Sequence, residues 1–179
     1  EDAARKIVEI NQDLLTMGRR GHYNQRVFDI NEIVTQAVTD LRAASRYITF
    51  DLKLCDNLMK ICGGQAQIHR AIVNLLVNAR DAIRGSGRIM IKTENYYADD
   101  TSLAFGRVPK GEYVKLTISD TGCGIPDDIV QRVFDPFFST KTADRKRGSG
   151  LGLSVVDAVV KDHQGYLDLS SEMGRGSSF

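Results

Sequence analysis

The amino-acid sequence predicts an α+β fold, a two-layer sandwich in which about three helices cover one face of a mixed sheet of about five strands. Two observations favour this fold. Short segments with alternating apolar side chains are typical of half-buried strands, and between them lie longer segments whose apolar side chains recur every three or four residues, as in amphipathic helices. The predicted strands are 47–54, 58–62, 88–95, 113–120, 166–171 and 177–179.

A separate helix is predicted before the sandwich, over residues 1–20. Its apolar side chains recur at alternating spacings of four and three residues, the pattern of a coiled coil or helical bundle. An amphipathic helix that packs on its own domain is the alternative. Gly18 and Gly21 end the helix, so we divide the chain into residues 1–25 and a domain of residues 26–179. The apolar stripe consists of Ala3, Ile7, Ile10, Leu14 and Met17.

Within the domain, the first predicted helix begins at the N-cap Asp29, and the other two cover residues 65–84 and 151–163. A polar loop of about fifteen residues is expected between the strands 88–95 and 113–120, longer than most structureless connections. A short helix is expected over 127–133, followed by an irregular, basic segment over 134–150.

The composition is that of one globular domain with a short appendage: 179 residues, 42% hydrophobic and 26% charged, with a net charge of +1. This charge gives no general attraction to nucleic acid or anionic lipid, so neither is expected as a partner. Three scattered cysteines without a C-x-x-C pair disfavour a disulfide framework or a zinc site and indicate a reducing compartment.

No apolar run approaches the ~20 residues that span a bilayer, and no signal peptide is visible. The chain begins without Met, so we expect a fragment of a longer protein. We expect a cytoplasmic location for this fragment, although the longer protein could be anchored in a membrane.

A polar stripe lies on the second predicted helix. Asn74, Asn78 and Asp81 stand at i, i+4 and i+7, so they share one face across two turns, while the other sides carry apolar residues. Amide and carboxylate oxygens can ligate Mg²⁺. A solvated helix face is the alternative interpretation.

The segment DTGCGIP (120–126) begins where a predicted strand ends. Gly122 and Gly124 allow a sharp turn and a close approach of the backbone to a ligand. Asp120 can accept a hydrogen bond from an exocyclic amine, which suits the edge of adenine. An ordinary Asp-x-Gly turn is the alternative.

The segment GSGLGL (148–153) opens the third predicted helix. Its backbone N–H groups lie at the positive end of the helix dipole and can bind an anion. The spacing excludes a P-loop and does not fit a dinucleotide-binding fingerprint. A basic run precedes it and could neutralise phosphates or be a solvated loop; it consists of Lys141, Arg145, Lys146 and Arg147.

Four segments together resemble the catalytic and ATP-binding domain of two-component sensor histidine kinases, which has the Bergerat ATP-binding fold. NLLVNARDAI (74–83) is similar to the N box of that family, DTGCGIP to its G1 box, FDPFFSTK (134–141) to its F box and GSGLGL to its G2 box. The resemblance covers residues 26–179, and residues 1–20 resemble the end of the dimerisation and phosphoacceptor bundle.

The resemblance implies ATP and Mg²⁺ as cofactors. Asn78 would ligate Mg²⁺, with Asn74 and Asp81 supporting the metal and the phosphates. Asp120 would bind the adenine amine, and Ser177, where the family more often has Thr, would keep a hydroxyl near the adenine.

The remaining site residues follow from the other boxes. Those that shape the adenine pocket would be Gly122, Gly124 and Ile125. A mobile lid over 127–147 would be anchored by Phe137 or Phe138, with Lys141 and Arg147 near the phosphates. The triphosphate would lie on Gly148, Ser149, Gly150, Leu151 and Gly152.

The residue at the first N-box position decides between related chemistries. Gyrase, chaperone and mismatch-repair ATPases of this fold typically have Glu there to activate water, whereas Asn74 cannot accept a proton near neutral pH. We therefore expect phosphoryl transfer to a histidine, with Asn74, Asn78 and Lys141 as catalytic residues. An ATP-hydrolysing machine and a non-catalytic nucleotide sensor are the alternatives.

The acceptor histidine is expected outside this chain, because His22, His69 and His163 all lack the H-E-x-x-x-P context of the family. The expected partners are ATP, a response-regulator receiver domain that takes the phosphoryl group onto aspartate, and a second copy of the protein joined through the helical bundle.

Overall fold

The structure is a computed structural model, and it describes residue 11 and residues 24–139 and 149–179. Apart from Asn11, the predicted helix over residues 1–20 lies outside these ranges. No helix among the residues that the structure describes is both long and apolar enough to cross a membrane.

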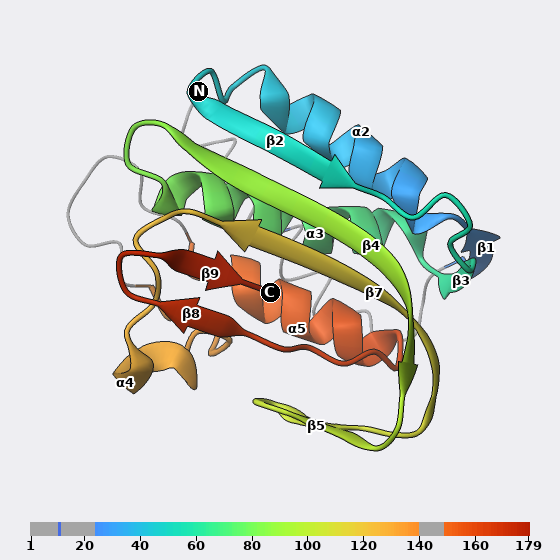
Figure 1. Ribbon diagram of the computed structural model, residues 1–179. Helices are drawn as coiled ribbons and strands as arrows, with labels where there is room; N and C mark the ends of the chain where they lie inside the picture. Colours follow the sequence, from blue (N-terminus) through green and yellow to red (C-terminus); the bar gives the residue numbers. More distant parts are fainter. Residues whose placement is uncertain (1–10, 12–23, 140–148) are drawn as a thin grey trace.

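A mixed sheet of five strands forms one layer, which confirms the predicted fold class (Figure 1). The strand order is β2-β4-β7-β9-β8. β2 and β4 are parallel, and the other neighbours are antiparallel. The parallel pair follows from the helix that crosses over between these two strands in the chain. The strands are β2 (Ile48–Lys53), β4 (Gly87–Ala98), β7 (Gly111–Asp120), β8 (Ser170–Glu172) and β9 (Gly176–Ser178).

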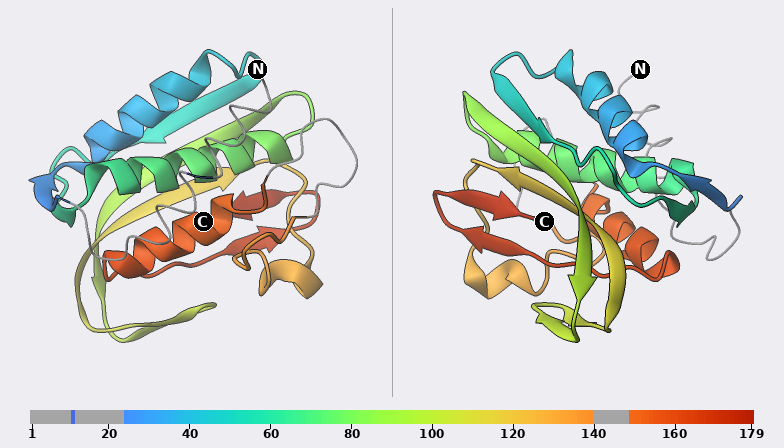
Figure 2. Two further views of the ribbon diagram at one scale, coloured as in Figure 1. Left: turned by 180° about the vertical axis from the view of Figure 1, so that it is seen from behind. Right: turned by 45° about the vertical axis from the view of Figure 1, so that its right-hand side comes forward.

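Three helices cover one face of this sheet, α2 (Ile30–Arg42), α3 (Gln65–Ala82) and α5 (Gly152–Asp162) (Figures 1 and 2). The N-cap prediction for α2 is confirmed, since the side chain of Asp29 accepts a hydrogen bond of 2.8 Å from the backbone N–H of Asn31. A short helix, α4 (Asp127–Val130), lies near the end of the sheet that carries β8 and β9 (Figure 1).

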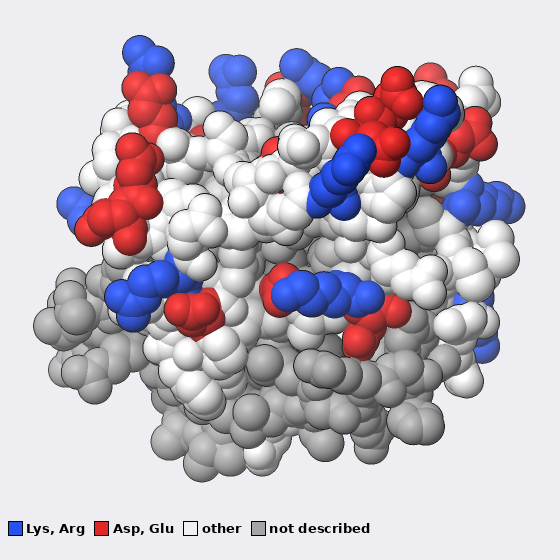
Figure 3. All heavy atoms as spheres, turned by 90° about the horizontal axis from the view of Figure 1, so that it is seen from below, with Lys and Arg blue, Asp and Glu red and all other residues white. Residues whose placement is uncertain are grey.

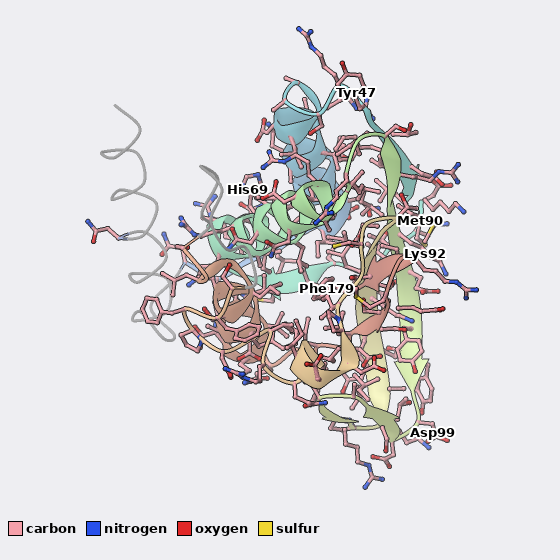
Figure 4. All side chains as sticks on the ribbon, turned by 90° about the vertical axis from the view of Figure 1, so that its left-hand side faces the viewer. Tyr47, His69, Met90, Lys92, Asp99 and Phe179 are labelled. Carbon is pink, nitrogen blue, oxygen red and sulfur yellow. The ribbon has the colours of Figure 1, made fainter. Side chains whose placement is uncertain are left out.

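The hydrophobic core lies between the two layers. Apolar side chains at helical spacing on α3 meet the inward-facing side chains of β4 and β7, and the residues between these along each strand point away from the helices. Figure 4 shows the two sides, with His69 on the helix layer and with Met90 and Lys92 on the opposite side of the sheet. Core residues less than 2% exposed include Leu76, Ile89, Ile91, Ile118 and Val155.

The predicted polar loop between residues 95 and 113 is wrong. β4 continues to Ala98 and pairs there with Gly111 of β7, so the two long strands extend past the rest of the sheet. Between them, β5 (Thr101–Leu103) and β6 (Gly106–Val108) form a hairpin. The acidic and glycine residues suggested a loop, but the tyrosines of β4 favour extended structure.

Two other strand predictions need correction. The predicted strand 58–62 is reduced to β3 (Ile61–Gly63), which pairs with β1 (Arg26–Phe28) in a separate two-stranded sheet. Of the predicted strand 166–171, only its last two residues belong to β8, which begins at Ser170. Both segments are apolar enough for a strand, but neither finds a long partner in the main sheet.

Candidate functional site

The polar face of α3 lies against the first turn of α5. The amide Nδ2 of Asn74 donates a hydrogen bond of 3.2 Å to the backbone oxygen of Gly152. A Cβ placed on Gly152 would lie 3.7 Å from Nδ2 of Asn78, which is ordinary van der Waals contact. The structure thus brings together the N box and the G2 box, which are far apart in the sequence.

Asp81, the third member of the predicted polar face, is held by its neighbour in the chain. Nε and Nη2 of Arg80 bind Oδ1 of Asp81 at 3.0 and 2.8 Å. The pair lies at the surface and is partly covered, with 24% of the Asp81 side chain and 30% of the Arg80 side chain exposed. The carboxylate at this end of α3 therefore has a positive partner within the chain.

Asp120 is a buried carboxylate at the end of β7. Its residue is only 8% exposed, and its Oδ1 accepts a 2.7 Å hydrogen bond from the backbone N–H of Gly122. Burial raises the pKa of Asp120 above its ordinary value, and hydrogen bonds from the backbone of Gly122 and Ser177 oppose this rise. The Asp-x-Gly turn exists, but a carboxylate in a purely structural turn is normally solvated. A buried carboxylate is therefore a candidate ligand-binding group.

Gly122 joins the G1 loop to the end of α3. A Cβ at this position would lie 2.6 Å from Oδ1 of Asp120 and 2.7 Å from the Cβ of Ala82, so no side chain fits. In the next residue, the N–H of Cys123 donates to the backbone oxygen of Ala82 at 3.0 Å. Asp120 is thereby fixed next to the end of the helix that carries the polar face.

The two terminal strands hold the other side of the G1 loop. The N–H of Ile125 donates to Oγ of Ser171 on β8 at 2.8 Å, and Oγ of Ser177 lies 2.9 Å from the same hydroxyl. Gly124 packs against the backbone of Glu172. The predicted residues Ile125 and Ser177 are therefore connected through Ser171. Sequence reasoning missed this serine, because a lone serine in a short strand carries no signal of its own.

The F box meets the glycine turn before α5 through its backbone. A Cβ on Gly150 would lie 2.7 to 2.9 Å from backbone atoms of Phe137, so this approach requires glycine. The side chain of Phe137 is 70% exposed, and the prediction that Phe137 or Phe138 anchors the segment stays a prediction. Phe138, the other candidate, is half-buried, and the guanidinium of Arg132 lies 4.7 Å from its ring centroid.

The glycine turn is described only in part. Leu151 is 1% exposed, so its side chain is interior and only its backbone is placed for a ligand. Its N–H lies 3.3 Å from Oγ of Ser149. The predicted residues Lys141, Arg147 and Gly148 lie outside the described residues, and their roles stay predictions.

The two histidines that the structure describes each contact another element of the fold. His69 Nε2 lies 3.8 Å from the carboxylate of Asp40. His163 Nε2 accepts a 2.9 Å hydrogen bond from the N–H of Gly64, the N-cap of α3, whose missing side chain cannot cap the helix. Its Nδ1 lies 2.7 Å from the oxygen of Val159, so His163 connects the end of α5 to the start of α3. The third histidine, His22, lies outside the described residues.

Comparisons with known proteins agree with this geometry. Residues 63–179 match the family model described as histidine kinase-, DNA gyrase B-, and HSP90-like ATPase. The chain is 34% identical over 182 residues to the sensor kinase CckA of Brucella abortus (strain 2308), in an alignment that covers 98% of this chain and 19% of CckA.

Two solved structures share the fold. Full-length ShkA in complex with AMPPNP is 21% identical with a TM-score of 0.77, covering 99% of this chain and 35% of that one. Histidine kinase ThkA in complex with the response regulator protein TrrA is 19% identical with a TM-score of 0.72, covering 99% of this chain and 47% of that one. The chain spans less than half the length of each of these proteins.

Proposed function

Because the chain belongs to the family of histidine kinase-, DNA gyrase B- and HSP90-like ATPases, we propose that it is the ATP-binding catalytic domain of a sensor histidine kinase, which transfers the γ-phosphoryl group of ATP to a histidine on an adjoining helical bundle. One observation carries this proposal. The segments proposed for the two ends of the nucleotide meet along α3, where Asn74 contacts Gly152 and Ala82 lies against Gly122.

Asp120 is the proposed adenine-binding residue. An ionised carboxylate has about four acceptor positions, so backbone hydrogen bonds leave capacity for an exocyclic amine. The bonds from Gly122 and Ser177 fix the orientation of the carboxylate before a ligand arrives. Gly124 and Ile125 shape the same pocket, because their segment is tied to β8.

The polar face of α3 fits Mg²⁺ bound together with a triphosphate. Its amides and carboxylate supply oxygens, which are the ligands that Mg²⁺ prefers, and Gly152 leaves the space beside the two asparagines unfilled by a side chain. Asn78 is the proposed ligand, and Asn74 and Asp81 support it. When bound, the ion would neutralise charge on the phosphates. Among the residues that the structure describes, no cluster of three His, Cys, Asp or Glu side chains could hold a metal ion.

Asn74 favours transfer to a protein acceptor over hydrolysis. Its amide donates to the oxygen of Gly152, and an amide cannot take a proton from water near neutral pH. The chain's own residues then bind and orient the nucleotide, which is most of what phosphoryl transfer requires. Steady ATP turnover by the chain alone would instead support the ATPase alternative.

The partners of the whole protein are part of the proposal. CckA is a sensor kinase, and the ThkA structure, which shares this fold, contains a response regulator. We extend both to this chain: a receiver domain would accept the phosphoryl group from the histidine, and two copies would meet through the helical bundle.

The test combines the chain with a purified acceptor bundle and ATP labelled on the γ-phosphate. We expect Mg²⁺-dependent label on histidine, lost in Asn78→Ala and retained in Asn57→Ala, a matched change at an exposed asparagine outside the site. ATP binding without label on histidine would contradict the proposal of a kinase. Equal losses in both variants would contradict the role of Asn78.

A further inference from the structure

Three phenylalanine rings form a chain of edge-to-face contacts along one end of the domain. The ring of Phe105, at the tip of the β5–β6 hairpin, lies 5.0 Å from that of Phe134 at an interplanar angle of 88°. The ring of Phe134 lies 6.4 Å from that of Phe179 at 86°. Perpendicular pairs at these distances are favourable beyond the area they bury. The hairpin is therefore joined to the F box and to the end of β9.

The hairpin is held in this place from its base and from its tip. At its base, Ala98 and Val108 are at most 5% exposed. At its tip, the N–H of Ala104 donates a 3.1 Å hydrogen bond to Oδ1 of Asp168, in the segment that leads into β8. Figures 1 and 4 show the hairpin folding back from the extended ends of β4 and β7 toward α4. Its tip is thus positioned to support the segment that follows α4.

Phe134 lies between this hairpin and two parts of the nucleotide site. Three residues after Phe134, the backbone of Phe137 contacts Gly150 in the turn before α5. On the other side, the backbone of Phe179 exchanges two hydrogen bonds of 2.9 Å with Ile118, which precedes Asp120 by two residues. A shift of the Phe134 ring would therefore reach the glycine turn and the adenine end of the site.

We propose that Phe105 is a positioning residue for nucleotide binding: its ring holds Phe134 in place, and the backbone of Phe137 then stays against Gly150. This inference rests on the proposed function, because it concerns the affinity of the same site for Mg²⁺-ATP. In this proposal Phe105 acts through Phe134 and not through contact with the nucleotide.

Charged groups on the hairpin do not explain its attachment. The ion pairs Arg107–Asp100 and Lys110–Asp99 join residues of the hairpin region to each other at 3.5 and 3.4 Å, with all four side chains more than half exposed. Exposed pairs of this kind contribute little to stability. On the face seen in Figure 3, basic and acidic side chains are intermingled rather than gathered by sign. The aromatic contact joins the hairpin to the F box, and these ion pairs do not.

The test compares Phe105→Ala with Tyr97→Ala, which removes an aromatic ring that is 58% exposed on the neighbouring β4. Calorimetry of the full chain measures Mg²⁺-ATP affinity, and hydrogen exchange measures protection of the amides of 132–138. We expect Phe105→Ala to weaken Mg²⁺-ATP binding about two- to tenfold, because the free energy of one aromatic pair corresponds to about that factor in an equilibrium constant. Amide exchange in 132–138 should become faster. Tyr97→Ala and the ring-retaining Phe105→Tyr should stay within about twofold of the unmodified chain.

Phe105→Leu provides the second variant, since it keeps an apolar side chain and preserves folding if Phe105→Ala does not. In a double-mutant cycle with Phe134→Leu, we expect the double variant to bind Mg²⁺-ATP no more weakly than the single variant of lower affinity. Both substitutions break the same contact between Phe105 and Phe134. The proposal would be overturned if the losses of affinity in the two single variants multiply fully in the double variant. It would also be overturned if a folded Phe105→Ala or Phe105→Leu variant has normal affinity and normal exchange. If the unmodified chain fails to bind Mg²⁺-ATP, the proposed function fails instead, while the exchange of 132–138 still tests the contact.

Discussion

Replacing Asp120 by asparagine is the sharpest test of the adenine end of the site. The substitution keeps the size of the side chain and leaves an amide oxygen that can accept the 2.7 Å hydrogen bond from Gly122. It removes the negative charge and replaces one carboxylate oxygen by an NH₂ group. An exocyclic amine of a ligand would then face a donor where it had an acceptor. Folding should therefore survive while nucleotide binding is lost.

The size of the loss follows from the burial of Asp120, which is 8% exposed. A hydrogen bond to a buried charged group contributes about 1.5–3 kcal/mol. Its removal should weaken Mg²⁺-ATP binding about 10- to 150-fold. The free energy of unfolding should be higher in the variant at neutral pH. The unmodified chain buries a charged carboxylate whose pKa is raised by burial, and the variant does not.

The dependence on pH has a defined sign. Because the pKa of Asp120 in the folded chain lies above its ordinary value of 3.8, the folded state binds the proton more tightly than the unfolded state. The contribution of this group to stability is complete below pH 3.8 and is lost as the pH rises through the raised pKa. The free energy of unfolding of Asp120→Asn relative to the unmodified chain should therefore increase over this interval and level off above it.

Calorimetry of ATP binding and urea denaturation across pH measure the two effects. Asp56→Asn, at an exposed carboxylate outside the site, is a control for the change of charge alone. Unchanged ATP affinity in a folded Asp120→Asn chain would refute the role of Asp120, and a stability difference independent of pH would refute the argument from its raised pKa.

Four further predictions concern the packing around the site. Gly176→Ala should destabilise the chain more than Gly174→Ala, as measured by urea midpoints. Both glycines have positive φ, which costs about 1–2 kcal/mol for alanine, but only at Gly176 would the Cβ meet the backbone of Asp120. His163→Ala should lower the free energy of unfolding by about 1–3 kcal/mol, because the buried N–H of Gly64 loses its acceptor. A loss below about 0.5 kcal/mol would contradict this reasoning. Ser171→Ala should weaken ATP binding severalfold through the freed N–H of Ile125, with Ser102→Ala on the hairpin as the neutral control in calorimetry. Asn74→Asp should abolish phosphoryl transfer to a histidine in the labelling assay and should also destabilise the fold, whereas a fully stable and active variant would contradict the importance of its hydrogen bond to Gly152.

Local patterns in the sequence were sufficient for helices α2 and α3. The cap at Asp29 and the apolar stripe of α3 depend on neighbours within a few residues, so periodicity reveals them. The contact of Asn74 with α5 could be expected only through the resemblance, because nothing local joins residues 74 and 152. The roles of the individual site residues stay predictions until ligand binding is measured.

Other features depend on contacts that no local pattern encodes. The segment around Phe105 was predicted as a loop because its polar residues hide two pairings: β4 continues along β7 as far as Ala98, and β5 then pairs with β6 in the hairpin. The importance of Phe134 arises from two rings far away in the sequence. The same holds for Ser171, whose hydroxyl matters only because β8 brings it to Ile125 and Ser177.

The identity of Asn74 satisfies two requirements at once, and this limits how the chemistry of the site can change. The backbone oxygen of Gly152 accepts a hydrogen bond from the amide of Asn74, and a carboxylate could not donate this bond. A glutamate or aspartate at this position would provide a base for water, but its oxygens would face the oxygen of Gly152 and repel it. Conversion to a hydrolase therefore requires a new way to fasten α3 to the first turn of α5, in addition to the base. On the proposed function, the choice of acceptor therefore depends on how the helices pack as well as on the reacting groups. A single substitution at Asn74 should remove transfer without creating efficient hydrolysis.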